Sequence, residues 1–204
     1  MDLYFLLCGT LTILISFGVF EKVLKSVKLN RWLVCCFLLL SCVFSAIEGI
    51  KIYGMNISLN LILYGILFIF LFFKQRTAKS FISCLIASLL VIAVLVCYRA
   101  INLSGFEYAY VQPYVYVAIV FGIVIYYLCP NFYSAFCGVF LGNVVFELLF
   151  HELSLSYSNE ILQLGSTLNV TFTFVCMIVF SLFSFFASSV KSLKNRKKQE
   201  KVNL

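Results

Sequence analysis

The sequence predicts an all-α fold, a polytopic bundle of transmembrane helices. Of its 204 residues, 63% are hydrophobic and only 11% are charged, whereas an ordinary soluble domain has about 25% charged residues. The mean hydropathy is +1.07. Long apolar runs follow one another along nearly the whole chain, and a span needs roughly 17 to 25 such residues to cross the hydrocarbon. The composition therefore excludes an ordinary soluble domain, so any site must lie among the helices or at their ends.

Seven apolar runs predict seven spans. Hydrocarbon offers the backbone no water, so each run must satisfy its amides within a helix, and the runs are too long and unbroken for barrel strands. The predicted spans are Leu3–Phe20, Trp32–Ile50, Ile57–Phe73, Phe81–Cys97, Pro113–Cys129, Phe132–Phe150 and Leu168–Ser188. We expect residues 1–188 to form the bundle and residues 189–204 to form a basic cytoplasmic tail. Six spans are the alternative.

The placement of Lys and Arg predicts the orientation. In a seven-span bundle, the first loop, the third loop and the tail share one side and hold 13 of the 15 basic residues. Lys51 and Arg99 are the two on the opposite side. Basic residues are enriched on the cytoplasmic side, so we expect the N-terminus outside and the C-terminus in the cytoplasm. Removing one span would break this alternation, which favours seven.

The basic tail predicts a membrane partner rather than a nucleic acid. Its basic residues are Lys191, Lys194, Arg196, Lys197, Lys198 and Lys201. Each basic residue near an anionic leaflet contributes about 1 kcal/mol. We therefore expect the lipid bilayer, and anionic lipid headgroups at the tail, to be the partners of the chain. The sequence does not identify a protein partner.

The fifth and sixth predicted spans are joined by a tight antiparallel hairpin, Cys129-Pro130-Asn131-Phe132. Pro130 favours the end of one helix because proline cannot continue the hydrogen-bond ladder. Asn131 is expected to cap the start of the next helix.

The sixth predicted span carries a close-packing face. Ser134, Gly138 and Gly142 recur every four residues. Small residues let a neighbouring backbone approach closely, which replaces the hydrophobic drive that is missing between helices in lipid. We therefore expect this helix to lie inside the bundle.

The same helix carries a polar face roughly opposite the small residues. Asn143, Glu147 and His151 also recur every four residues, and a charged group at that depth is costly unless it is paired, protonated or in contact with water. With polar groups near the outer ends of other spans, they form a candidate polar pocket: Glu48, Arg99, Asn143, Glu147 and His151. The alternative is structural, with Glu147 paired to Arg99 or hydrogen-bonded across helices and the other groups reaching the headgroups.

The residues give little support for catalysis, a cofactor or a metal. The chain has one histidine and no H-E-x-x-H, G-x-S-x-G or glycine-rich phosphate loop. Its nine cysteines lie in apolar runs or at their ends without a C-x-x-C pair, so we expect them to pack as small apolar residues. We predict a non-enzymatic protein with no cofactor.

The overall layout resembles the small uncharacterised YphA-type membrane proteins of Bacillota. The resemblance rests on the chain length, the basic first loop and the segment Ile52-Tyr53-Gly54-Met55-Asn56-Ile57-Ser58, which runs directly into an apolar span. The short hairpin before the Gly138/Gly142 helix belongs to the same layout. The resemblance implies a multi-pass protein of a bacterial cytoplasmic membrane, and it implies no activity and no functional residues.

Two classes of function remain open. One is a non-catalytic membrane protein that acts through helix packing or partner binding, in which Gly138 and Gly142 tolerate substitution worse than Glu147. The other is a small transporter, channel or substrate-binding subunit with a polar outer pocket, in which substitution of Glu147 or Glu48 abolishes uptake.

Overall fold

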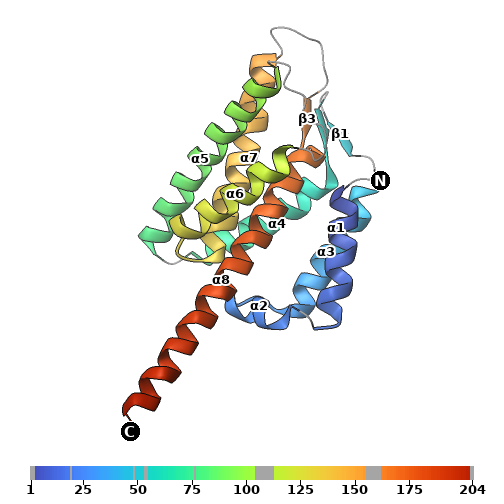
Figure 1. The fold of residues 1–204 in the computed structure, drawn as a ribbon. Coiled ribbons are helices and arrows are strands. Elements are labelled where there is room, and N and C mark those ends of the chain that lie inside the picture. Colours follow the sequence, from blue (N-terminus) through green and yellow to red (C-terminus); the bar gives the residue numbers. More distant parts are fainter. Residues whose placement is uncertain are drawn as a thin grey trace.

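The computed structural model is mostly helical and carries a small sheet at one end (Figure 1). It describes residues 3–18, 20–47, 49–52, 55–75, 77–103, 113–154 and 162–202. The elements, in chain order, are α1 (Leu3–Ser16), α2 (Glu21–Ser26), α3 (Arg31–Ser45), β1 (Ile50–Ile52), β2 (Met55–Ile57), α4 (Leu59–Phe73), α5 (Ala78–Leu103), α6 (Pro113–Leu128), α7 (Phe132–Ser154), β3 (Leu162–Leu164) and α8 (Thr167–Val202). We call the end that carries the strands the sheet end and the opposite end the α2 end.

Among the residues that the structure describes, three helices are long and apolar enough to cross a membrane, which indicates a membrane protein. They are the segments Ala78–Arg99 of α5, Phe132–Phe150 of α7 and Leu168–Ser192 of α8. Four further apolar helices, α1, α3, α4 and α6, have 14 to 16 residues. At 1.5 Å per residue each is only about 21–24 Å long, less than the ~30 Å of hydrocarbon.

The first predicted span is shorter than expected because the chain turns after Ser16. Gly18 has a φ of +80°, a conformation open to glycine, and its N–H donates to the Ile15 carbonyl at 2.9 Å. The Arg31 guanidinium donates to the Ser16 carbonyl at 2.6 Å. A cation at the C-terminal end of a helix satisfies free carbonyls there and interacts favourably with the helix dipole. Arg31 therefore stabilises the end of α1.

The three-stranded sheet was not expected in an all-α protein. β1 and β2 pair antiparallel with Lys51 opposite Asn56, and β2 pairs parallel with β3 with Asn56 opposite Gln163. Ile50-Lys51-Ile52 and Met55-Asn56-Ile57 each alternate apolar and polar side chains, which is the period of a strand. The second predicted span, Trp32–Ile50, is therefore too long: the helix α3 ends at Ser45, and Ile50 belongs to β1.

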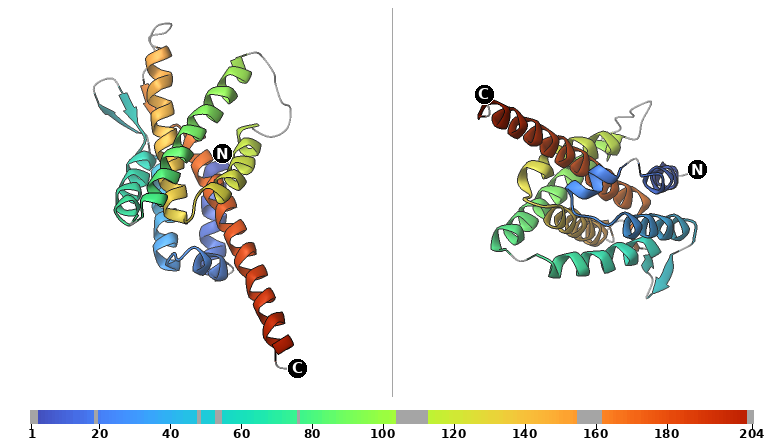
Figure 2. Two further views of the ribbon diagram at one scale, coloured as in Figure 1. Left: turned by 90° about the vertical axis from the view of Figure 1, so that its left-hand side faces the viewer. Right: turned by 90° about the horizontal axis from the view of Figure 1, so that it is seen from below.

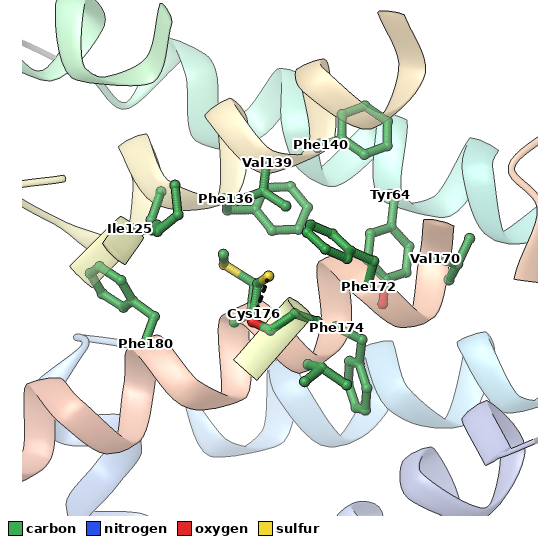
Figure 3. Close-up of a cluster of buried hydrophobic side chains, with 14 of the residues drawn as sticks. Tyr64, Ile125, Phe136, Val139, Phe140, Val170, Phe172, Phe174, Cys176 and Phe180 are labelled. Atoms are coloured by element: carbon green, nitrogen blue, oxygen red, sulfur yellow. Dashed lines mark hydrogen bonds between the residues drawn. The ribbon is translucent and has the colours of Figure 1, made fainter. Parts of the chain in front are cut away.

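Helices α7 and α8 form the centre of the bundle (Figures 1 and 2). α5 packs along α7, α6 packs along α8, and α7 also contacts α8 and α4. Figure 3 shows Tyr64 of α4 beside the parallel rings of Phe136 and Phe140, which lie 6.0 Å apart on α7. The expectation that the sixth predicted span lies inside the bundle is confirmed, because residues 134–140 are all buried.

The hairpin between α6 and α7 follows the predicted chemistry. The side-chain oxygen of Asn131 accepts the Ser134 N–H at 2.8 Å. The prediction that Asn131 caps this helix is confirmed. Cys129, the last buried residue before the turn, precedes the exposed Pro130.

Helix α1 stands apart from the centre and packs mainly on α3 (Figure 1). α2 joins α1 to α3 and contacts α8 at the α2 end. Beyond that contact α8 runs on past the other helices, and its backbone stays helical through most of the basic segment 189–204, to Val202 (Figure 2).

Candidate functional site

Glu147 is a buried carboxylate near the sheet end of α7, with 8% of its surface exposed. It accepts three hydrogen bonds from the start of α8. The Gly165 N–H donates to Oε2 at 2.7 Å, and the Ser166 N–H and Asn169 Nδ2 donate to Oε1, each at 2.8 Å. A carboxylate only accepts hydrogen bonds, and such charge-assisted bonds are the strong ones. Glu147 therefore hydrogen-bonds across helices, which is one of the alternatives that the sequence leaves open.

The start of α8 is built to receive this carboxylate. The first N–H groups of a helix have no partner within the helix, and its N-terminal end carries partial positive charge. Gly165 has a φ of +74°, which turns the chain from β3 into α8, and a Cβ there would collide with the Ser58 Oγ. The Ser166 Oγ accepts the Asn169 N–H at 3.4 Å as a weak cap. Glu147, which belongs to α7, supplies the acceptor for the Gly165 and Ser166 N–H groups.

Asn143 lies one turn before Glu147 on α7 and contacts the next turn of α8. Its Nδ2 donates to the Thr173 Oγ1 at 2.6 Å, and that hydroxyl donates to the Asn169 carbonyl at 3.1 Å. Two buried oxygens, Asn143 Oδ1 and Asn169 Oδ1, have no hydrogen-bond partner. Leaving a buried polar atom unpaired costs about 1–3 kcal/mol, so these two acceptors require an explanation.

A second polar network connects α1, α3 and α4 in the same half of the bundle. The Ser41 hydroxyl donates to the Asn60 Oδ1 at 3.0 Å. The Tyr4 hydroxyl contacts the Ser41 hydroxyl and lies 3.2 Å from the Tyr64 hydroxyl. Because Tyr64 also faces the Asn143 and Glu147 region of α7, it lies between the two networks.

The small residues of α7 lie against α5. A Cβ on Gly138 would come within 2.6 Å of the Ala87 Cβ, and a Cβ on Gly142 would come within 2.7 Å of the Ser88 carbonyl oxygen. Real Cβ atoms do not approach so closely. Ser134 is fully buried and donates its hydroxyl to the Asn131 carbonyl at 3.0 Å.

Arg99, another residue of the predicted pocket, does not join Glu147. Arg99 is exposed, and its guanidinium carbon lies 4.8 Å from the ring centre of Phe150. No ion pair between Arg99 and Glu147 occurs in the described part of the chain. Glu48 and the side chain of His151 lie outside what the structure describes. Of the predicted residues whose side chains the structure describes, Asn143 and Glu147 lie on one face of α7 and contact α8, and Arg99 does not.

A larger apolar cavity lies between the α1–α3 pair and the central helices. Its volume is about 150 Å³. We call it the chamber, and its walls include Leu11 and Ile15 of α1, Val23 and Leu24 of α2, Leu38 of α3, Leu67 of α4 and Met177 of α8. Among the described residues that line it, only Tyr64 and Ser181 carry a hydroxyl group and none carries a charge. An apolar space of this size can accept a small apolar group.

Sequence reasoning missed most partners of these groups. Asn60, Asn169 and Thr173 are buried polar residues inside apolar runs, which is a usable signal because such residues need partners in hydrocarbon. The chamber left a weaker signal in residues 21–28, where the apolar Leu24 and Val27 alternate with basic residues in a segment that the sequence analysis treats as a loop.

No family model, no curated protein and no solved structure matches this chain. The resemblance to YphA-type proteins therefore stays a prediction from the sequence.

Proposed function

We propose that this chain is a non-catalytic, seven-span protein of a bacterial cytoplasmic membrane that binds an anionic lipid in its chamber. The N-terminus and the sheet end face outside, and the α2 end and the basic tail face the cytoplasm. The observation that carries the proposal is the chamber itself. It is an apolar cavity lined at the α2 end by α2, a short helix with basic residues on its exposed side.

The chamber suits a hydrocarbon chain. An empty apolar cavity forfeits the dispersion contacts of the atoms that line it. The bilayer supplies acyl chains at no cost of transfer from water. A chain that enters the chamber exchanges its contacts with neighbouring lipids for contacts with the lining atoms, which thereby recover theirs. The lining residues Leu11, Phe37 and Leu67 are apolar and only partly buried, so a chain that enters the chamber would contact their side chains.

Helix α2 suits an anionic headgroup. Its Leu24 is buried and lines the chamber, whereas Lys22 and Lys25 are exposed. Lys25 pairs with Glu21 at 2.8 Å, but both side chains are largely exposed and such a pair contributes little to stability. A phosphate placed beside α2 would therefore meet basic groups while its acyl chain occupies the chamber.

The transporter alternative receives less support. Asn143 and Glu147 bind their own chain, and the cavity beside them measures only about 10 Å³. That volume is on the order of one water molecule. A solute larger than that has no described space at this position.

A tryptophan scan of two neighbouring positions tests the proposal. Leu67 lines the chamber, whereas Ile66, the preceding residue of α4, is 63% exposed. In full-length protein purified in mild detergent, phosphatidylglycerol should raise the thermal unfolding temperature in a saturable manner, and more than phosphatidylcholine does. Leu67→Trp fills the chamber and should remove this rise, and Ile66→Trp should keep it.

A second variant, Val34→Trp, also fills the chamber from α3 and guards against a folding defect specific to Leu67→Trp. The Lys22→Gln/Lys25→Gln double variant should reduce the preference for phosphatidylglycerol. The proposal is wrong if both chamber-filling variants respond to phosphatidylglycerol as the unsubstituted protein does.

A further inference from the structure

Tyr64 of α4 is the single described residue that lines both the chamber and a second, smaller cavity. The smaller cavity lies between α4, α7 and α8, toward the sheet end, and its volume is about 10 Å³. The surface that it offers is almost wholly carbon. The Tyr64 side chain therefore separates two apolar spaces.

Three helices pass from one space to the other at the level of Tyr64. On each of them, a residue that lines the chamber lies about one or two turns from a residue that lines the smaller cavity, and the second residue is the one nearer the sheet end. The pairs, chamber residue first, are Leu67 and Leu61 on α4, Phe136 and Phe140 on α7, and Phe174 and Val170 on α8.

The Tyr64 side chain is held in place by its neighbours, and only 3% of it is exposed. Its hydroxyl lies 3.2 Å from the Tyr4 hydroxyl of α1. The centre of its ring lies 5.1 Å from that of Phe37, which meets it edge-on, and 5.9 Å and 6.5 Å from those of Phe136 and Phe140, which stack on it (Figure 3). A ring packed between α3 and α7 and anchored to α1 forms a fixed end of the chamber.

The chamber has a limited depth below this ring. Its lining runs from Tyr64 to Leu71 on α4 and from Phe174 to Leu182 on α8. At 1.5 Å per residue, these two walls are about 10–12 Å long. A saturated chain with bonds of about 1.5 Å and angles of about 111° advances about 1.25 Å per carbon. The depth of the chamber therefore corresponds to about eight to ten carbons.

We propose that Tyr64 determines how much of a hydrocarbon chain the chamber accepts, and that it stops the chain after about eight to ten carbons. This inference rests on the function proposed above, in which the headgroup lies beside α2 and the chain extends from there toward the sheet end. The chamber is only partly enclosed, so further carbons of a longer chain stay in the surrounding lipid.

Removal of the ring should lengthen the chamber. In Tyr64→Ala the space of the ring joins the chamber to the smaller cavity, whose lining reaches Leu61 on α4 and Val170 on α8. These residues lie one turn beyond the present end, which adds about 4–6 Å and therefore three to five carbons. The chamber of this variant should accept correspondingly more of the chain.

A series of chain lengths tests the proposal on the full-length protein in mild detergent. Phosphatidylglycerols with two identical saturated chains of six to sixteen carbons are added at equal mole fraction in the micelle. The rise in unfolding temperature is measured from each variant's own lipid-free value. For the unsubstituted protein, the rise should grow with chain length up to about eight to ten carbons and then stay constant. We call the length at which it becomes constant the chain-length limit.

Four variants locate the limit at Tyr64. Tyr64→Ala and Tyr64→Val, the second of which leaves less empty space, should each raise the limit, by about three to five carbons in Tyr64→Ala. Tyr64→Phe keeps the ring and should keep the limit. Phe172→Ala empties an equally buried position that lines neither cavity, so it should lower the lipid-free unfolding temperature and keep the limit.

The outcomes separate this inference from the proposed function. A rise that still grows at sixteen carbons in the unsubstituted protein overturns the role of Tyr64. So does a limit that is the same in Tyr64→Ala and Tyr64→Val as in Tyr64→Phe, or one that Phe172→Ala shifts equally. In each of these cases a response that Leu67→Trp removes leaves the lipid proposal standing. No response to phosphatidylglycerol at any chain length overturns both.

Discussion

At the scale of single residues, Glu147 illustrates how a carboxylate is tolerated among apolar helices. Its partners are the donors of the next helix rather than a basic side chain. Neutral donors fixed in a folded backbone can hold a negative charge because their partial charges all point toward it. The same arrangement uses every local donor, which leaves the nearby amide oxygens of Asn143 and Asn169 unpaired.

Close approach at α7 gives a prediction for two glycines. Gly138→Val and Gly142→Val should each destabilise the protein by about 1–3 kcal/mol, because their side chains would overlap α5. Gly65→Ala is the matched control, since its Cβ would meet only the Phe140 ring at 4.0 Å. Denaturant or thermal unfolding of the purified variants measures the difference. If Gly138→Val unfolds like Gly65→Ala, the tight contact with α5 is wrong.

At the scale of elements, the start of α8 depends on another helix for its cap. Glu147→Gln places an amide N–H₂ group where three donors now converge, so at least one donor loses its acceptor. We expect a loss of about 1–3 kcal/mol of stability and faster amide hydrogen exchange at Gly165 and Ser166.

Glu21→Gln is the matched control for that substitution. Glu21 is half-exposed and its ion pair with Lys25 lies on the surface of α2. The change should leave the thermal unfolding temperature almost unchanged, because exposed ion pairs contribute little to stability. Equal stability and equal amide exchange in the two variants would show that Glu147 does not hold the start of α8.

At the scale of the whole molecule, the α2 turn, the turn between α4 and α5 and the outgoing part of α8 lie toward one end, and the strands lie toward the other (Figure 1). Basic residues dominate the first group of segments, with Lys22, Lys25, Lys74 and Lys79 among them. A bundle with this arrangement presents one basic face to the membrane surface.

Reporter fusions test the orientation that we propose. Green fluorescent protein fused after Lys28, Lys79 or Lys201 should fluoresce, and alkaline phosphatase at those positions should be inactive, because they would be cytoplasmic. Alkaline phosphatase inserted in segment 104–112 should be active. An active phosphatase after Lys201, or six rather than seven crossings in the complete fusion series, contradicts the proposed topology.

The sequence by itself determined the helical character, the membrane class and the places where most helices lie. A long apolar run must form a helix because hydrocarbon offers its backbone amides no water to hydrogen-bond. The side chain of Asn131, which can cap a helix, identified the start of α7. The same reasoning overestimated the lengths of α1 and α3, because an apolar run can continue beyond the end of a helix into a turn or a strand. Gly18 and the strand from Ile50 to Ile52 decided those ends.

The tertiary structure alone decided which polar residues meet. Helical spacing placed Asn143 and Glu147 on one face of α7, but it could not show that α8 would supply their partners. The meeting of Glu147 with Gly165, Asn143 with Thr173, and α2 with the chamber depends on how helices distant in sequence pack. Periodicity within a helix fixes the direction of a side chain, and only the packing of the helices fixes what that side chain contacts.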